Sequence, residues 1–172
     1  MKKKLDASEF SEWVELYSDD LFNWALSRTG KLELAEDLVQ ETFMSAFKAR
    51  DKFNQKSKPK TWLISILNNK IYDHFRRKLK LNEVSQDEFF DESGSWVEEM
   101  NPNEWSDDIE RGLRKCISKL PEVWAIAIRM KYLNGEDSEE ICQELEITPS
   151  NYWQIVHRAK MQLRICLEKN VL

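Results

Sequence analysis

The sequence predicts an all-α protein that consists of two small helical domains joined by an acidic linker. Apolar residues recur at helical spacing through most of the 172 residues, and glycine and proline number only four each, which disfavours a β fold built on tight turns. The helical spacing is lost over residues 82–106. We therefore place a three-helix domain at residues 1–81, the linker at 82–106 and a four-helix domain at 107–172.

Three amphipathic helices are expected in the N-terminal domain. Apolar and aromatic residues repeat from Phe10 to Trp24, and Gly30 lies where a glycine cap would end the first helix. A second helix follows from Leu32 to Ala46. The polar stretch 54–59 separates it from a third helix, whose apolar stripe runs from Leu63 to Phe75. These spacings predict one compact helical unit.

Charge changes sign in blocks along the chain. Residues 48–80 contain eleven Lys or Arg and two acids, whereas residues 82–110 contain eleven Asp or Glu and no Lys or Arg. The net charge of −5 hides this pattern, which indicates several partners, one of them a polyanion. Solvated helix faces remain the alternative for each block. The charged linker is expected to be poorly ordered unless it is bound.

The C-terminal domain begins with two helices. Apolar positions from Ile109 to Leu120 form the first, which Pro121 ends while also starting the next helix. The segment from Val123 to Met130 is apolar nearly all round, which predicts a buried helix, and Gly135 closes it.

A helix-turn-helix is expected from Ser138 to Arg164. Ser138 can cap a short helix, and Thr148 followed by Pro149 is a strong start signal for a long one. Such a pair presents its second helix to a DNA major groove. Glu146 lies in the turn where many such motifs carry glycine, and an ordinary helical hairpin remains the alternative. The residues expected to face outward are Asn151, Trp153, Gln154, His157, Arg158 and Lys160.

The third helix carries a second nucleic-acid signal. Ser65, Asn69, Asp73 and Arg76 follow a spacing that places them on one helix face. Trp62 and Tyr72 are aromatic candidates for stacking on unpaired bases, with nearby lysines for phosphate contacts. A core position for Trp62 is equally compatible with the pattern.

The cysteines Cys116, Cys142 and Cys166 form an odd, widely spaced set that suggests no disulfide framework. Cys142 and Cys166 fall on apolar stripes, where a free cysteine packs as a small hydrophobe. Their spacing relative to His157 matches no tetrahedral zinc pattern, so no metal site and no cofactor are expected.

No run approaches the length of a membrane span, and no apolar stretch follows the basic residues 2–4, as it would in a secretory signal. We therefore expect a cytoplasmic protein without direct membrane insertion.

Five segments, in three parts of the chain, resemble the extracytoplasmic-function (ECF) group of sigma-70-type sigma factors. Residues 35–43, Ala-Glu-Asp-Leu-Val-Gln-Glu-Thr-Phe, resemble the segment that binds core RNA polymerase. Residues 62–77 resemble the helix for the minus-ten promoter element. Leu120-Pro121, the Tyr-Leu-Asn-Gly of residues 132–135, and residues 138–159 resemble the domain that reads the minus-35 element. The similar segments occur in the family's order and spacing.

The resemblance implies a role for specific residues. Asp37, Gln40 and Glu41 would contact the β′ coiled-coil of core RNA polymerase. Residues implied in minus-ten binding are Phe53, Lys60, Trp62, Asn69, Asp73, Arg76 and Arg77. Residues implied in minus-35 binding are Asn151, Trp153, Gln154, His157, Arg158 and Lys160. Residues 151–155 depart from a Thr-Val-Lys-Ser-Arg run common in relatives, so phosphate attraction there should be weaker.

The resemblance also implies the partners: core RNA polymerase through its β′ and β subunits, promoter DNA and an anti-sigma factor. The expected function is an alternative sigma factor that directs promoter-specific initiation. The main alternative is a helix-turn-helix regulator that binds duplex DNA without polymerase. An enzyme has little support, because His74 and His157 lie in separate domains without a nucleophile or a phosphate-binding loop.

Overall fold

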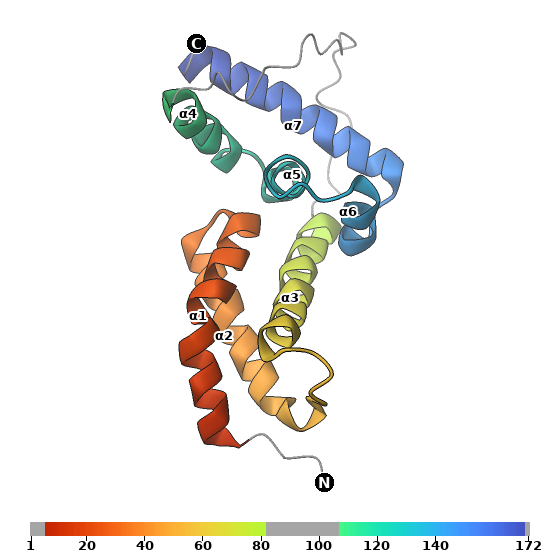
Figure 1. The fold of residues 1–172 in the computed structure, drawn as a ribbon. Helices are drawn as coiled ribbons and strands as arrows, with labels where there is room; N and C mark the ends of the chain where they lie inside the picture. The colour runs from red at the N-terminus through yellow and green to blue at the C-terminus, as the bar shows by residue number, and fades with distance from the viewer. Residues whose placement is uncertain (1–5, 82–106, 171–172) are drawn as a thin grey trace. The chain divides into compact units, whose positions relative to one another are not determined.

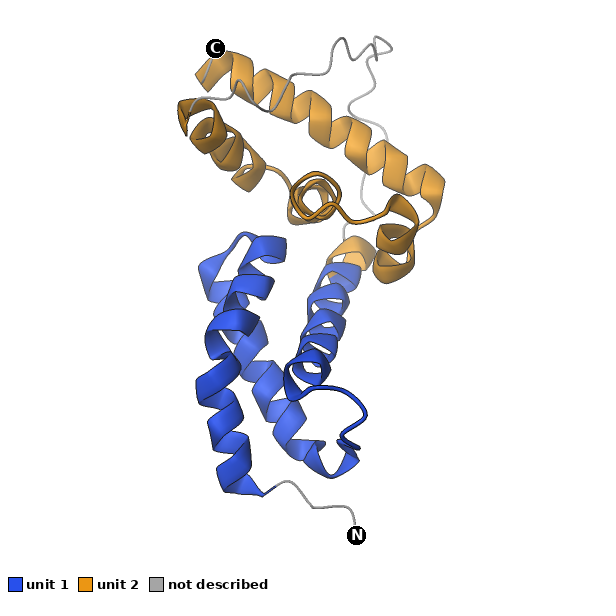
Figure 2. Cartoon of the chain, viewed as in Figure 1, with its two compact units in different colours: residues 1–77 blue, residues 78–172 orange. Residues whose placement is uncertain are grey.

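The computed structural model describes residues 6–81 and 107–170, and both parts are helical (Figure 1). The predicted all-α class is confirmed: no strand occurs within these residues. The chain forms two compact units, residues 1–77 and 78–172 (Figure 2). The predicted linker, residues 82–106, lies outside the described residues, and the domain boundaries at 81 and 107 stay predictions.

The first unit is built on α1 (Ala7–Thr29), α2 (Leu32–Lys48), the short 3-10 helix η1 (Arg50–Lys52) and α3 (Pro59–Leu81). Helices α1 and α2 lie side by side (Figure 1). All three long helices contribute side chains with no exposed surface to the core. These are Leu21, Ala25, Ala35, Ala46, Leu63, Leu67 and Ile71.

Local sequence signals account for the ends of α1. The Asp6 carboxylate accepts hydrogen bonds from the backbone N–H groups of Ser8 (2.9 Å) and Glu9 (2.8 Å), which caps the N-terminus. Gly30 takes a left-handed conformation, φ 65°, and its N–H donates to the Leu26 carbonyl at 2.8 Å. The glycine cap predicted at Gly30 is therefore confirmed.

The second unit contains α4 (Asp107–Ser118), α5 (Glu122–Ile128), a π-helical turn η3 (Arg129–Leu133), α6 (Ser138–Leu145) and α7 (Pro149–Asn170). Helix α7 packs against α4, α5 and α6. The fully buried side chains come from several of these elements. They include Ile126, Ala127, Met130, Ile141, Tyr152 and Ala159.

The caps of the helix-turn-helix are partly as predicted. The Thr148 hydroxyl accepts from the Asn151 N–H at 3.2 Å, which confirms it as a cap of α7. The Ser138 cap is wrong by one residue. Asp137 has the extended backbone of a cap, and its carboxylate accepts from the Glu139 N–H at 2.8 Å, so Ser138 is the first helical residue.

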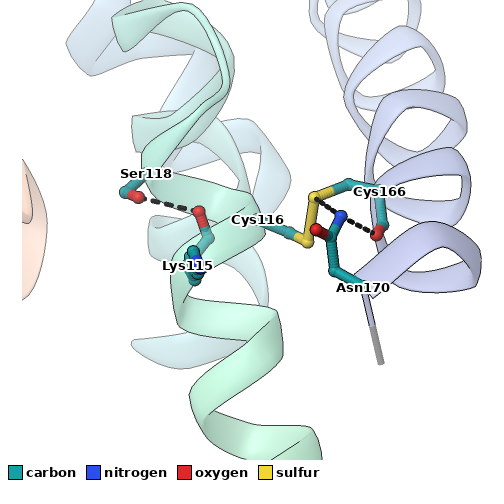
Figure 3. The surroundings of a disulfide bond; sticks show 5 residues. All are labelled: Lys115, Cys116, Ser118, Cys166 and Asn170. Carbon is teal, nitrogen blue, oxygen red and sulfur yellow. Dashed lines mark hydrogen bonds between the residues drawn. A yellow bond between two sulfur atoms is a disulfide. The ribbon is translucent and has the colours of Figure 1, made fainter. Parts of the chain in front are cut away.

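The expectation that the cysteines form no disulfide is wrong for two of them. Cys116 of α4 and Cys166 of α7 are bonded, with their Cα atoms 5.8 Å apart and a separation of 50 positions in the chain (Figure 3). Each lies on an apolar stripe because α4 packs on α7, and that same packing brings the two sulfurs together. Cys142 is free and buried, as expected for core packing.

None of the described helices is long and apolar enough to cross a membrane.

Candidate functional site

The outer face of α2 is acidic and exposed. Asp37, Gln40 and Glu41 are all exposed, whereas Leu38, Val39 and Thr42 are buried on the opposite side of the helix. Positions i, i+3 and i+4 share one helix face, so the three predicted core-binding residues form one continuous surface. The described acids exposed on this helix are Glu33, Glu36, Asp37 and Glu41.

One member of this face, Met44, was not among the predicted contact residues. Met44 is 60% exposed and follows Asp37 by seven residues and Gln40 by four, so it lies on the same side of α2. Exposed methionine side chains beside polar and charged residues are typical of protein–protein contacts. The spacing of seven residues between Asp37 and Met44 could have predicted from sequence that both lie on one helix face. The Lys70 ammonium lies 3.6 Å from the Glu41 carboxylate, so α3 borders this surface.

An aromatic cluster joins α1, the segment after η1 and α3. The ring centroid of Phe53 lies 5.1 Å from those of both Trp13 and Trp62, and the two tryptophan centroids are 6.4 Å apart. All three residues are half-buried. Trp62 thus packs against other rings, as a core residue would. It also keeps part of its surface accessible, as a ring that stacks on a base would need.

Trp13 belongs to this cluster and was interpreted from sequence only as part of an apolar stripe. Tyr72 is the converse case: it is 4% exposed and faces the core, so the expectation that it could stack on a base is wrong. Tyr72 lies next to Ile71 and three residues before Phe75, both buried, which places its ring on the inner side of α3.

The polar residues predicted for minus-ten binding lie along α3. Asn69 and Asp73 are exposed and one turn apart. Asp73 bonds to both following arginines: its carboxylate accepts from Arg76 at 2.7 Å and its backbone carbonyl from Arg77 at 3.2 Å. The structure therefore brings Asn69, Asp73, Arg76 and Arg77 together on one part of the helix.

Lys60 lies at the start of α3 and is paired within the unit. Its ammonium contacts the Asp20 carboxylate of α1 at 2.6 Å, with each side chain a little under half exposed. An ion pair this exposed contributes little to stability, so it can exchange for a phosphate without a large cost.

The outer face of α7 is largely as predicted. Asn151, Trp153 and Gln154 are exposed, and Trp153 retains 51% of its surface. His157 and Arg158 are half-buried, as is Lys160, whose ammonium lies 4.8 Å from the centre of the Tyr132 ring. The supporting side of the helix is buried. Its members are Tyr152, Ile155, Val156, Ala159 and Leu163.

The turn between α6 and α7 contains a strained residue. Glu146 has φ 54° and ψ 43°, the left-handed conformation that usually requires glycine. The turn is held by the Ile147 N–H, which donates to the Cys142 carbonyl at 3.0 Å. Glu146 thus replaces the glycine that is common at this position of the turn, but its backbone keeps the conformation that a glycine would adopt.

Burial shifts the pKa of three ionisable groups in the second unit. It raises the pKa of the Tyr152 phenol and of the Cys142 thiol, where Glu139 adds to the effect. It lowers the pKa of the Arg129 guanidinium, with a further contribution from nearby Arg114. Within the described residues, no group of three or more His, Cys, Asp or Glu side chains could hold a metal ion.

Two family models match the chain, and each covers one of the two helical units described above. Sigma-70 region 2 covers residues 13–80, which include the acidic α2 face, the aromatic cluster and most of α3. Sigma-70 region 4 covers residues 110–163, which include α5, α6 and the part of α7 up to Leu163.

Curated relatives agree with the family models. A probable RNA polymerase sigma factor of Haemophilus influenzae is 37% identical over 166 residues, which is 88% of this chain and 86% of the relative. The ECF sigma factor SigM of Bacillus subtilis is 28% identical over 93% of this chain and 96% of its own length. Among solved structures, the sigma factor RpoE of Bartonella quintana, determined with the anti-sigma factor NepR, shares 25% identity over 94% of this chain and 98% of its own, with a TM-score of 0.48.

The acidic α2 surface, the basic α3 helix and the helix-turn-helix therefore occur in a chain that matches both sigma-70 regions and full-length relatives. The chain belongs to the ECF group of sigma-70-type sigma factors, the alternative sigma factors that direct promoter-specific transcription initiation by RNA polymerase.

Proposed function

We propose that this sigma factor divides its work among three surfaces: the α2 face binds core polymerase, the α3 region holds the opened minus-ten strand, and α7 reads the minus-35 duplex. The observation that carries the proposal is the α2 face. A regulator that binds duplex DNA alone has no use for an exposed acidic face on a helix remote in sequence from its helix-turn-helix. Such a face suits a partner protein.

Charge complementarity supports the first assignment. Asp37 and Glu41 present carboxylates, Gln40 adds a hydrogen-bonding amide, and Met44 adds an apolar contact. Charged residues of this kind steer association and fix the register of two surfaces. We assign the face to the β′ coiled-coil, which would then be basic where it meets these carboxylates.

The α3 region suits single-stranded DNA. Proteins that bind single strands combine aromatic rings, on which bases stack, with a basic path for phosphates. Phe53 and Trp62 offer partly accessible rings next to the lysine-rich segment 56–60. Asn69 can bond the exposed edge of an unpaired base, while Arg76 and Arg77 hold the backbone.

The outer face of α7 suits closed duplex. Gln154 and Arg158 can form directed hydrogen bonds to base edges, with Asn151 and His157 as further polar contacts, and Lys160 suits phosphate. Trp153 offers apolar contact with a thymine methyl group. The recognition helix is supported by buried residues on its other side, which gives these side chains a fixed base.

We place the protein in the cytoplasm, where RNA polymerase acts, as a subunit without catalytic activity of its own.

We assign Tyr132 and Leu133, both about half exposed, to contact with the β subunit. The family resemblance favours an anti-sigma factor as a further partner that covers both domains.

Reconstituted transcription tests the proposed function. Core polymerase and this protein together should initiate at a cognate promoter, and neither should do so alone. Binding to promoter DNA without detectable affinity for core polymerase would favour the helix-turn-helix regulator instead.

A further inference from the structure

The disulfide joins two helices at one end of the second unit. Cys116 lies in the last turn of α4, and Cys166 lies four residues before the end of α7 (Figure 3). Cys116 is 2% exposed, whereas Cys166 is half-buried and reachable from solvent. The Asn170 amide donates to the Cys166 carbonyl at 2.7 Å and approaches its sulfur at 3.6 Å.

Helix α4 packs against α7 and α5, and its residues Ile109 and Leu113 are half-buried. Its buried side chains are Cys116 and Ile117. Two ion pairs on α4, Arg111 with Asp108 and Arg114 with Glu110, join residues of the same helix. The Cys116–Cys166 bond therefore adds a covalent link to the apolar packing that holds α4 against α7.

A protein that works with RNA polymerase is kept in a reducing compartment, where disulfides are rare and those that form are usually transient or redox-sensing. On this basis, which rests on the proposed function, we propose that Cys116 and Cys166 form a reversible oxidation site that locks α4 onto α7. Cys142 of α6 is free and buried, so only two of the three cysteines, Cys116 and Cys166, form the disulfide.

The chemistry requires an oxidant such as a low-molecular-weight disulfide. The Cys166 thiolate, the more accessible of the two, attacks one sulfur of this reagent, forms a mixed disulfide and releases one thiolate. The Cys116 thiolate then attacks the Cys166 sulfur and releases the second. Overall, two protein thiols lose two protons and two electrons, and the reagent is reduced to two thiols. Reduction is the reverse, beginning with attack on Cys166.

The lock acts on the fold more than on the DNA-facing residues. It closes a loop that spans 50 positions and contains α5 and α6. Gln154 precedes Cys166 by twelve helical residues, about 18 Å along α7 at the usual rise. Reduction should therefore loosen α4 and lower the thermal stability of the unit, while α5 and α6 still support the DNA-facing half of α7.

The test uses the full chain in glutathione buffers that span oxidising to reducing ratios. Alkylation after unfolding, read by mass spectrometry, should find one thiol at the oxidising end and three at the reducing end. Reduction should lower the Tm of the second unit by on the order of 10 °C. Hydrogen exchange in α4 should accelerate at least about ten-fold, with little change around residues 151–160.

Variants identify the sulfurs responsible. Cys166→Ser, at the more exposed position, and Cys116→Ser should each resemble the reduced protein and lose the redox response. The control Cys142→Ala should keep the difference between its oxidised and reduced states, whatever its absolute Tm.

Three outcomes would overturn the proposal. Three thiols at every buffer ratio would show that the bond does not form, and one thiol even at the reducing end would show that it is not reversible. Equal Tm and exchange in the two states would show that it locks nothing. None of these readouts depends on transcription, so failure here is distinguishable from failure of the proposed function.

Discussion

The two regions proposed to contact DNA, on α3 and α7, differ in how their side chains are held. On α3, charged residues are paired within the unit, as in Lys60 with Asp20 and Arg76 with Asp73. The Trp62 ring meets Phe53 and Trp13 in tilted and edge-on contacts. On α7, Asn151 and Gln154 project from a helix whose other side is fully packed. The first arrangement offers ring surfaces and exchangeable cations, and the second offers a shaped helix with directed side chains.

This difference explains the proposed division between opened and closed DNA. An unpaired base presents a flat face and free edges, which rings and an amide can hold. A closed duplex presents a groove that admits a helix, and base edges that amide and guanidinium groups can distinguish. Neither of these two regions has the continuous acidic face of α2, which distinguishes the proposed polymerase contact from both.

The largest expected effect concerns the polymerase contact on which both regions depend. Replacing Asp37 and Gln40 together by alanine should weaken binding to core polymerase at least about ten-fold, a loss of about 1.4 kcal/mol or more. Both residues are exposed, so the fold should remain intact by circular dichroism. Glu15→Ala, an exposed acid on α1, is the matched control and should bind normally in the same titration. Unchanged affinity of the double variant would remove α2 from the interface.

A second prediction concerns the aromatic cluster. Phe53→Ala should reduce promoter opening by several-fold because the ring between Trp13 and Trp62 is lost. Phe53→Leu keeps apolar volume without an aromatic face. Equal loss of opening in both variants, measured with a fluorescent reporter in the minus-ten element, would support stacking. If the leucine variant opens normally, Phe53 serves packing alone.

A smaller effect is expected at the turn that orients α7. Glu146→Gly should raise the free energy of unfolding by about 1 kcal/mol, since glycine adopts the left-handed conformation without strain. Glu144→Gly, inside α6, should have the opposite sign, about 1 kcal/mol of destabilisation. Urea denaturation measures both. Destabilisation by Glu146→Gly would mean that the glutamate side chain contributes more than its backbone strain costs.

The sequence predicted the helices well because their signals are local. Apolar spacing, the Gly30 cap and the Thr148 cap are each readable within a few residues. Features that depend on packing between helices were harder. The sequence could not show that Cys116 and Cys166 meet, because their adjacency depends on how α4 lies against α7.

The same limit applies to the candidate site. Exposure along α2 and α7 follows from helical spacing, so Asp37, Gln40 and Gln154 were placed correctly on outer faces. Trp13 and Tyr72 both fit apolar or aromatic patterns, but which ring joins Phe53 and which enters the core depends on tertiary packing. The DNA and polymerase roles of all these residues stay predictions.

We propose above that α3 binds opened DNA and that α7 binds closed duplex. Permanganate footprinting of the minus-ten region, run beside a low-temperature binding assay on the same promoter, tests it most directly. Asn69→Ala should reduce permanganate reactivity and leave closed-complex binding nearly unchanged. Gln154→Ala should weaken the closed complex by about 1–3 kcal/mol, as expected for a good base contact. Equal effects of both substitutions in both assays would contradict the claim.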